Sequence, residues 1–203
     1  MKIICFLILI FTHQLVSSKS NDSPNLDFKK VQSQSWNEWK KDLKKTLKKE
    51  NFSDSTLDLL DEINFNPKVI EYDRKQPEFK LTFEKYLQRN INEQKKKDIN
   101  KIYKQNKELL LLLNKKFKVD PRILVSLWGI ETYFGKHIGK MDILRSLLSL
   151  AYDGRRQEFF LKEFKLALKI LEDGHVSQKD FRGSWAGAFG QTQFMPSTFH
   201  KFA

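Results

Sequence analysis

One glutamate, Glu131, stands in an otherwise apolar and aromatic stretch, SLWGIETYFGK over residues 126–136. If the stretch is helical, Leu127 lies one turn behind Glu131 on the same side, so the carboxyl group points where apolar side chains point. Loss of solvation raises the pKa of a carboxyl group and keeps it protonated, and cleavage of a glycosidic bond needs such a proton donor. The sequence leaves one alternative open, a solvated Glu131 at the helix rim or paired with Arg122 or Lys136.

A glycine-rich segment, GSWAGAFGQTQFMPS over residues 183–197, supplies groups that suit a sugar ligand. It holds a hydroxyl at Ser184, amides at Gln191 and Gln193, and several aromatic side chains. Glycine lets the backbone approach a ligand closely, amides and hydroxyls bind polar groups, and flat rings cover sugar faces. The segment therefore predicts a saccharide-binding loop, and a tight helix–helix junction is the alternative.

The remaining polar residues do not form a metal-binding pattern in the sequence. The histidines at positions 137, 175 and 200 have neither cysteine neighbours nor a helical His-x-x-x-His spacing, so no metal and no cofactor are expected. The sequence has no acidic residue from Gly183 to Ala203. This absence suits an enzyme with one catalytic carboxylate. Asp142 and Asp153 stay open as possible second carboxylates, but both stand where helix N-caps are expected and the capping role is favoured.

The elements that position these groups are expected to be helices. Asp120 suits an N-cap, Pro121 the first helical position, and Gly135 the point where the chain leaves the helix. Near the start, Ser35-x-x-Glu38 forms a capping-box pattern before an amphipathic helix whose tryptophans are expected to pack on the domain rather than on a membrane. Further helices are expected over 54–63, from Pro77 onwards after an extended piece at 70–76, and over 98–118, 142–152 and 155–172. The stretch 90–97 is expected to be a loop or a helix end. No stretch keeps a period of two, so the fold class is all-α.

The first twenty residues are typical of a secretory signal peptide, with Lys2, an apolar run and a small-residue exit. They predict a periplasmic or secreted protein. The apolar run is too short for a stable membrane-spanning helix, which needs about 20 apolar residues. Cys5 lies inside this segment, so the mature chain has no cysteine and no disulfide.

The net charge of +12 comes mainly from lysine, because only seven of the 37 basic residues are arginine. Lysine-rich surfaces attract anionic partners, which leaves a peripheral membrane contact open. The scarcity of arginine, together with the signal segment, disfavours nucleic acid.

Motifs along the chain resemble, in order, those of the membrane-bound lytic murein transglycosylase B family, bacterial enzymes that cut peptidoglycan glycan strands without water. The motifs are YDRKQPEF followed by TFEKY, VDPRILVSLWGIETYFGKHIGK, LLSLAYDGRR and GSWAGAFGQTQFMPS. The resemblance implies a lysozyme-like helical catalytic domain over residues 66–203, after a signal peptide at 1–20 and a linker with amphipathic helices at 21–65. The family pattern continues beyond Ala203, so the domain is expected to be truncated at its C-terminus.

The resemblance also implies roles for individual residues. Glu131 is implied as the catalytic acid and base, and Thr132 stands where related enzymes often carry serine. The implied substrate-binding residues are Tyr86, Tyr133, Arg155, Arg156, Ser184 and Gln193. For the two arginines, contact with substrate carboxylates and ion pairing with nearby acids both stay open.

The implied reaction opens the β-1,4 bond between N-acetylmuramic acid and N-acetylglucosamine and leaves 1,6-anhydro ends. The expected partner is a peptidoglycan glycan strand, bound by a monomer. Two alternatives stay open: a lysozyme-like muramidase that uses water, and a secreted helical wall-binding module without catalysis.

Overall fold

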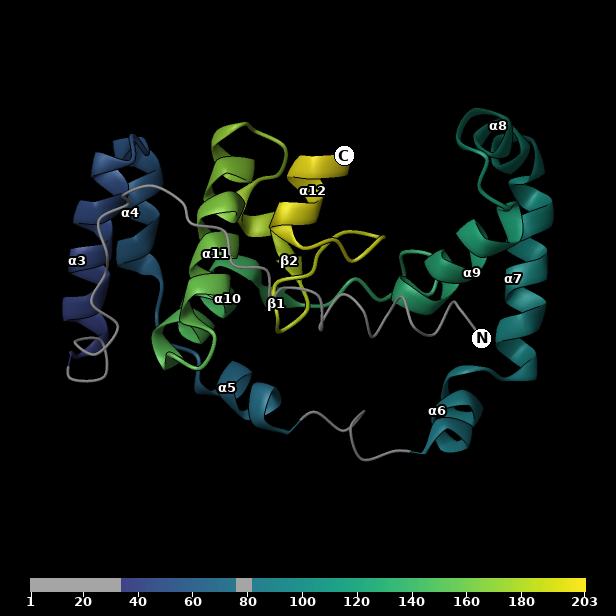
Figure 1. Cartoon of the computed structure of the whole chain (residues 1–203), viewed down its shortest axis with the longest axis horizontal. Helices are drawn as coiled ribbons and strands as arrows, with labels where there is room; N and C mark the ends of the chain where they lie inside the picture. The colour runs from purple at the N-terminus through teal and green to yellow at the C-terminus, as the bar shows by residue number, and fades with distance from the viewer. Residues whose placement is uncertain (1–33, 76–81) are drawn as a thin grey trace, which may run out of the picture.

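The computed structural model describes residues 34–75 and 82–203, apart from the side chain at position 89, and consists mainly of α-helices (Figure 1). The predicted signal peptide and most of the leader after it lie outside the described residues. The helices are α3 (Trp36–Lys49), α4 (Asp54–Glu62), α5 (Pro67–Arg74), α6 (Phe83–Asn90), α7 (Glu93–Gln105), α8 (Lys107–Phe117), α9 (Pro121–Thr132), α10 (Ile143–Asp153), α11 (Gln157–Glu172) and α12 (Pro196–Phe202). Within these residues the sheet is one antiparallel pair of short strands, β1 (Met141–Asp142) and β2 (Arg182–Gly183). The all-α prediction is confirmed.

The described helices fall into two groups, which Figure 1 shows at opposite ends of its long axis. One group contains α3, α4, α5, α10, α11 and α12, and the other contains α6 to α9. The main hydrophobic core lies in the first group, where α10 and α11 pack together. Side chains fully removed from solvent there include Trp39, Leu43, Leu47, Leu60, Ile143, Leu147, Phe164 and Leu168.

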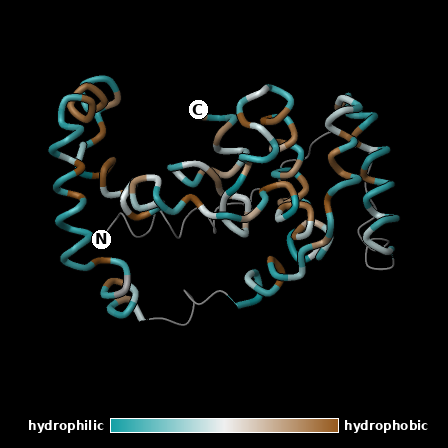
Figure 2. Tube along the Cα trace, turned by 180° about the vertical axis from the view of Figure 1, so that it is seen from behind, coloured by the Kyte–Doolittle hydropathy of each residue, from teal (hydrophilic) through white to brown (hydrophobic). Residues whose placement is uncertain are grey.

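The second group buries less apolar surface. Figure 2 shows hydrophobic residues along α8 as well as where α10 and α11 meet. On α8, however, Leu109 is 55% exposed and Leu112 is 60% exposed. Because hydrophobic stabilisation follows the apolar area removed from water, the stability of the fold rests mainly on the first group.

Helix α3 begins as the sequence predicts. The Ser35 hydroxyl accepts a hydrogen bond from the backbone N–H of Glu38, and the Glu38 carboxylate accepts one from the backbone N–H of Ser35. Trp39 is fully buried, and Trp36 meets Tyr152 of α10 edge-on with 5.2 Å between ring centroids. The prediction that these tryptophans pack on the domain is confirmed. The division at residue 66 stays a prediction, although α3 and α4 share a core with α10 and α11.

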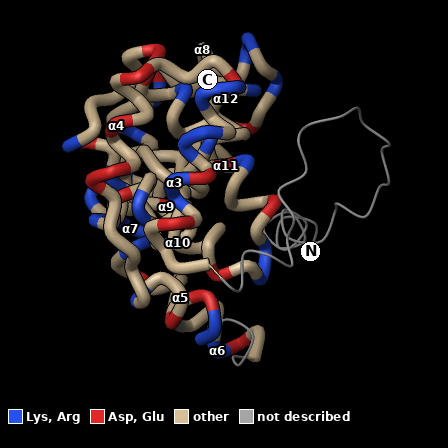
Figure 3. Tube along the Cα trace, turned by 90° about the vertical axis from the view of Figure 1, so that its left-hand side faces the viewer, with Lys and Arg blue, Asp and Glu red and all other residues tan. Residues whose placement is uncertain are grey.

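Most of the basic surface charge comes from lysine, and lysine side chains lie beside acidic side chains. Figure 3 shows basic and acidic residues interspersed along the helices. Lys44 of α3, for example, bonds to Asp58 at 3.0 Å and to Asp61 at 2.7 Å, both on α4. Among the residues that the structure describes, no helix is both long and apolar enough to cross a membrane.

The extended piece predicted at residues 70–76 is wrong over 70–74, which lie on α5. The helix forms there because the Asn66 side chain accepts a hydrogen bond from the backbone N–H of Lys68, and Pro67 occupies the first turn. Positions 76 and 77, where that piece ends and the next helix was expected to begin, are outside the described residues.

The loop or helix end predicted at 90–97 is confirmed at Asn90, where α6 ends, but is wrong from Glu93 onwards, and the continuous helix predicted at 98–118 is interrupted at Asn106. Helix α7 starts at Glu93, because the Asn92 side chain caps it by accepting from the backbone N–H of Lys95 at 2.8 Å. It ends before Asn106, whose side-chain amide donates to the carbonyl of Ile102 at 2.9 Å. Asparagine competes with the helical backbone through such local bonds, so α8 begins as a separate helix.

Lys40 of α3 bonds to the C-terminal end of α4, and a substitution at this position tests how much that contact stabilises the fold. Its ammonium group is buried and donates to the backbone carbonyls of Leu60 and Ile63, each at 2.8 Å, at the end of α4. We expect Lys40→Met to lower the free energy of unfolding by about 2 kcal/mol, because those carbonyls lose a charged donor. Urea unfolding followed by circular dichroism measures the loss. Lys41→Met, on the exposed side of α3, is the control and should change little; an equal loss would contradict the assignment.

Candidate active site

Helix α9 carries Glu131 in its last turn. The Asp120 side chain accepts from the backbone N–H of Arg122 at 2.8 Å and Pro121 opens the helix, as the sequence predicts. The helix ends at Thr132, and Tyr133, Phe134 and Gly135 then follow in the left-handed region, with φ of 51°, 60° and 83°.

Left-handed backbone is costly for large side chains, so a run of this kind needs support. The hydroxyl of Thr132, which is fully buried, accepts a hydrogen bond from the backbone N–H of Gly135 at 3.0 Å. The same hydroxyl donates to the carbonyl of Gln191 at 2.8 Å. Thr132 thus fixes the turn after Glu131 and binds the glycine-rich loop.

Other contacts hold this loop against α9 and against the segment that follows α9. The indole N–H of Trp128 donates to the side-chain oxygen of Gln191 at 2.8 Å. Near β1 and β2, a Cβ on Gly139 would stand 2.1 Å from the carbonyl oxygen of Gly183, so the two backbones touch where only glycine fits. The structure therefore brings together the two segments on which the sequence analysis rests.

The carboxyl group of Glu131 is half-buried, and this loss of solvation raises its pKa above the ordinary value. The apolar residues beside it on α9 cover it only in part, because Leu127, one turn back, is 38% exposed and Ile130, directly before it, is 44% exposed. Arg122 forms its ion pair with Asp120. Lys136 lies over the ring of Tyr133, 4.9 Å from the centroid. Arg122 and Lys136, the two cations considered as partners of Glu131, therefore interact with other residues.

Ser184 and Gln193 help to build the loop itself. The Ser184 hydroxyl accepts from the backbone N–H of Ala188 at 3.0 Å. The Gln193 amide donates to the carbonyls of Ile138 at 3.1 Å and Gly190 at 3.0 Å, with Gln193 in the left-handed region at φ 50°. Both side chains hold the loop in the shape that it presents to α9.

The two tyrosines predicted to bind substrate lie outside the glycine-rich loop, Tyr86 on α6 and Tyr133 directly after α9. Tyr133 turns towards α7, where its hydroxyl donates to the carboxylate of Asp98, and this bond lowers the pKa of Asp98 and raises that of Tyr133. Tyr86 is 38% exposed on α6, which Figure 1 shows below α9. Asp98 as the partner of Tyr133 was not predicted, because it lies 35 residues away on a separate helix.

Arg155 and Arg156 converge on Asp73 of α5. The side chain of Asp73 is 1% exposed and accepts from Arg155 at 2.9 Å, and also from Arg156 and Arg74. The ion-pair alternative for these arginines is present in the structure. Asp73 was not predicted as the partner of these arginines, although its place beside Arg74 in the YDR motif was a signal.

The two aspartates assigned to caps differ. Asp142 caps α10 as predicted, accepting from the backbone N–H of Arg145 at 2.9 Å. The N-cap predicted for Asp153 is wrong: it is the last residue of α10 and pairs with Arg74 at 2.8 Å. Gly154 in the left-handed region ends α10 after Asp153, so no helix begins there.

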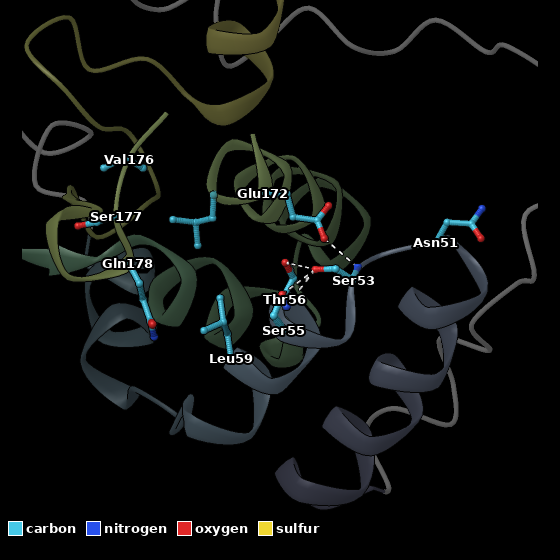
Figure 4. Close-up of a pocket in the computed structure, with 10 residues that line it drawn as sticks. Asn51, Ser53, Ser55, Thr56, Leu59, Glu172, Val176, Ser177 and Gln178 are labelled. Atoms are coloured by element: carbon cyan, nitrogen blue, oxygen red, sulfur yellow. Dashed lines mark hydrogen bonds between the residues drawn. The ribbon is translucent and has the colours of Figure 1, made fainter. Parts of the chain in front are cut away.

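A surface hollow of about 620 Å³ lies elsewhere, between α4 and the end of α11 (Figure 4). Its one lining carboxylate, Glu172, accepts from the backbone N–H of Ser53 at 2.8 Å at the start of α4. That acid serves the helix terminus, where negative charge is favourable. None of the predicted site residues lines this hollow, so we place the candidate site at α9 and the glycine-rich loop.

Known proteins resemble this chain in sequence and in fold. Residues 35–203 match the family described as "Transglycosylase SLT domain". The chain is 38% identical over 88 residues to membrane-bound lytic murein transglycosylase B of Escherichia coli K12, an alignment covering 43% of this chain and 24% of that protein.

Solved structures are similar over more of the chain. SltB3 from Pseudomonas aeruginosa, in complex with NAG-NAM-pentapeptide, matches with a TM-score of 0.78 and 35% identity over 84% of this chain and 46% of that one. SltB1 from the same organism matches with a TM-score of 0.73 and 25% identity over 81% and 56%. The chain therefore spans about a quarter of the length of the Escherichia coli protein and less than half of SltB3.

Asp73→Ala tests the arginine cluster. We expect it to lower the free energy of unfolding by roughly 3 kcal/mol, because Arg74, Arg155 and Arg156 all lose their bonds to this buried acid. Chemical denaturation measures the loss. Glu71→Ala removes an exposed acid on the same helix and should change little. If the two variants lost the same stability, the cluster would not be a structural clamp.

The raised pKa of Glu131 predicts how stability depends on pH. The folded pKa lies above the unfolded one, so the folded state binds the proton more tightly and stability falls as pH rises from the unfolded to the folded pKa. Glutamine does not ionise. We therefore expect Glu131→Gln to be more stable, relative to the parent chain, at neutral pH than below the ordinary value of 4.5. Urea unfolding at both pH values is the measurement, and a pH-independent difference would contradict burial of the carboxyl group.

Proposed function

Because the chain belongs to the transglycosylase SLT domain family, we propose that it is a lytic transglycosylase that cleaves the β-1,4 bond between N-acetylmuramic acid and N-acetylglucosamine in peptidoglycan. The observation that carries the proposal is the half-buried Glu131, whose pKa is raised by loss of solvation. Support for the substrate class comes from SltB3, whose structures hold NAG-NAM-pentapeptide and NAG-anhNAM-pentapeptide.

Glu131 acts as acid and then as base in the proposed reaction. Partial loss of solvation favours its protonated form, which first donates its proton to the bridging oxygen, while positive charge develops at the anomeric carbon of the muramic sugar. The glycosidic bond breaks and leaves Glu131 as a carboxylate. That carboxylate then takes the proton of the sugar's own C6 hydroxyl, whose oxygen attacks the anomeric carbon.

The product is a 1,6-anhydro ring, and Glu131 is protonated again at the end of the cycle. The substrate supplies its own nucleophile, so one carboxylate is enough. A hydrolase would need a second carboxyl group at roughly 5 to 9.5 Å to act as nucleophile or to activate water.

The proposed substrate-binding residues come from several segments of the fold. Ser184 and Gln193 contribute from the loop, and Tyr86 and Tyr133 from the helical group of α6 to α9. Arg155 and Arg156 bind lactyl or peptide carboxylates while they remain bonded to Asp73. The side chain of Arg155 is 49% exposed, which leaves N–H groups available for a second anion.

We also propose the place of action. Residues 1–20 act as a signal peptide that delivers the chain to the periplasm or outside the cell, residues 21–65 form a linker and amphipathic helices, and residues 66–203 form the transglycosylase part. The protein works as a monomer on glycan strands, with its lysines available to an anionic membrane surface.

Glu131→Gln is the test of this function. We expect turnover of purified peptidoglycan to fall at least about a hundredfold, because glutamine cannot transfer the proton. Glu62→Gln, which changes an exposed glutamate on α4, should retain full activity. Mass spectrometry of the parent chain's products should show muramic ends that lack one water. Reducing ends would indicate a muramidase, and binding without turnover by the parent chain would indicate a wall-binding module.

A further inference from the structure

Gln191 joins the glycine-rich loop to α9 through its main chain and its side chain together. Its carbonyl accepts from the buried hydroxyl of Thr132 at 2.8 Å, and its side-chain oxygen accepts from the indole N–H of Trp128 at 2.8 Å. Its amide group also lies over the bare Cα of Gly135, since a Cβ there would stand 2.9 Å from the Gln191 amide carbon. One loop residue thus contacts α9 before and after Glu131.

Helical geometry places these contacts beside the carboxyl group. Successive residues are rotated by about 100°, so Trp128 and Glu131 are about 60° apart around α9, and Thr132 follows Glu131 directly. The face that binds Gln191 therefore borders the face that carries Glu131. Gln191, although exposed, therefore holds the loop next to the part of α9 that carries Glu131, and loosening it would change the surroundings of the carboxyl group.

We propose that Gln191 is a positioning residue, which holds the loop against the end of α9 and thereby keeps Glu131 in a fixed, half-buried setting. The inference rests on the proposed function for its catalytic consequence. The assignment concerns the acceptor oxygen of Gln191, because the Trp128 indole can only donate. A carboxylate at position 191 can replace that acceptor, whereas a hydrophobic side chain of similar length cannot.

Three variants separate positioning from general stability. Gln191→Met keeps the length of the side chain but removes the amide oxygen. Gln191→Glu keeps an acceptor for Trp128 and adds a charge near Glu131. Thr192→Ala changes the neighbouring exposed residue and is the matched control.

For Gln191→Met we expect kcat on purified peptidoglycan to fall about five- to tenfold with KM little changed, the effect of losing one hydrogen bond that orients the acid. The basic limb of the pH–rate profile should move to lower pH, because a better solvated Glu131 loses its proton more readily. Gln191→Glu should recover kcat at its own optimum, with that limb moved to higher pH by the added negative charge. Thr192→Ala should match the parent chain in each measurement.

The titration of Glu131, followed by carboxyl ¹³C NMR, tests the inference independently of turnover. If the parent chain does not turn over peptidoglycan, the proposed function fails, yet the inference stands when Gln191→Met lowers the Glu131 pKa and Thr192→Ala does not. Unchanged kcat and an unchanged Glu131 titration in Gln191→Met would overturn it. So would an equal effect of the methionine and glutamate variants, because the acceptor would then be irrelevant.

Discussion

The hydrogen bond from the Thr132 hydroxyl to the Gln191 carbonyl is the contact on which the candidate site depends. Its donor side chain has no exposed surface, so water competes for this part-buried bond less than for bonds at the surface. The same hydroxyl also holds the backbone of Gly135. Loss of this one group would release both the unusual turn after α9 and the loop that faces it.

The turn after α9 shows why such support is needed. Left-handed backbone at Tyr133 and Phe134 costs free energy that glycine would avoid. Phe134 meets Trp128 edge-on at 5.4 Å, and its ring lies against Gly129, where a Cβ would stand 2.9 Å away. Packing of the two rings, with the Thr132 hydroxyl, offsets the cost of the turn. Partial burial of the Glu131 carboxyl group adds a further cost at neutral pH, where an ordinary glutamate is ionised.

Signals that act within a few residues were readable from the sequence. The capping box at Ser35 and the cap and proline at the start of α9 are local, and the structure contains them. The break between α7 and α8 at Asn106 is also local, because the Asn106 side chain bonds to the preceding turn. Such a bond is only slightly more favourable than continuing the helix. The apolar spacing, which continues across Asn106, therefore predicted a single helix.

Contacts between distant segments were not readable in this way. Asp73 and Arg155 are 82 residues apart, and Trp128 and Gln191 are 63 apart. Composition and spacing showed that both partners carried useful groups but could not show which groups would meet. A loop rich in amides also offers several donors and acceptors, and only its folded path decides that Gln191 meets α9 while Gln193 bonds to Ile138 and Gly190.

The path of the loop is fixed from outside as well as by α9. The start of the loop is fixed because β2 pairs with β1. The end of the loop is fixed by Glu163 of α11, which is 2% exposed and accepts a hydrogen bond from the backbone N–H of Ser197 in the first turn of α12. Both of these anchors belong to the well-packed group of helices, whereas α9 belongs to the group with exposed apolar side chains. The loop is therefore held rigidly on one side, and Thr132, Trp128 and Gln191 align the less tightly packed α9 with it. Because the acid stands on the less tightly packed partner, the setting of Glu131 depends on this contact more than on the hydrophobic core.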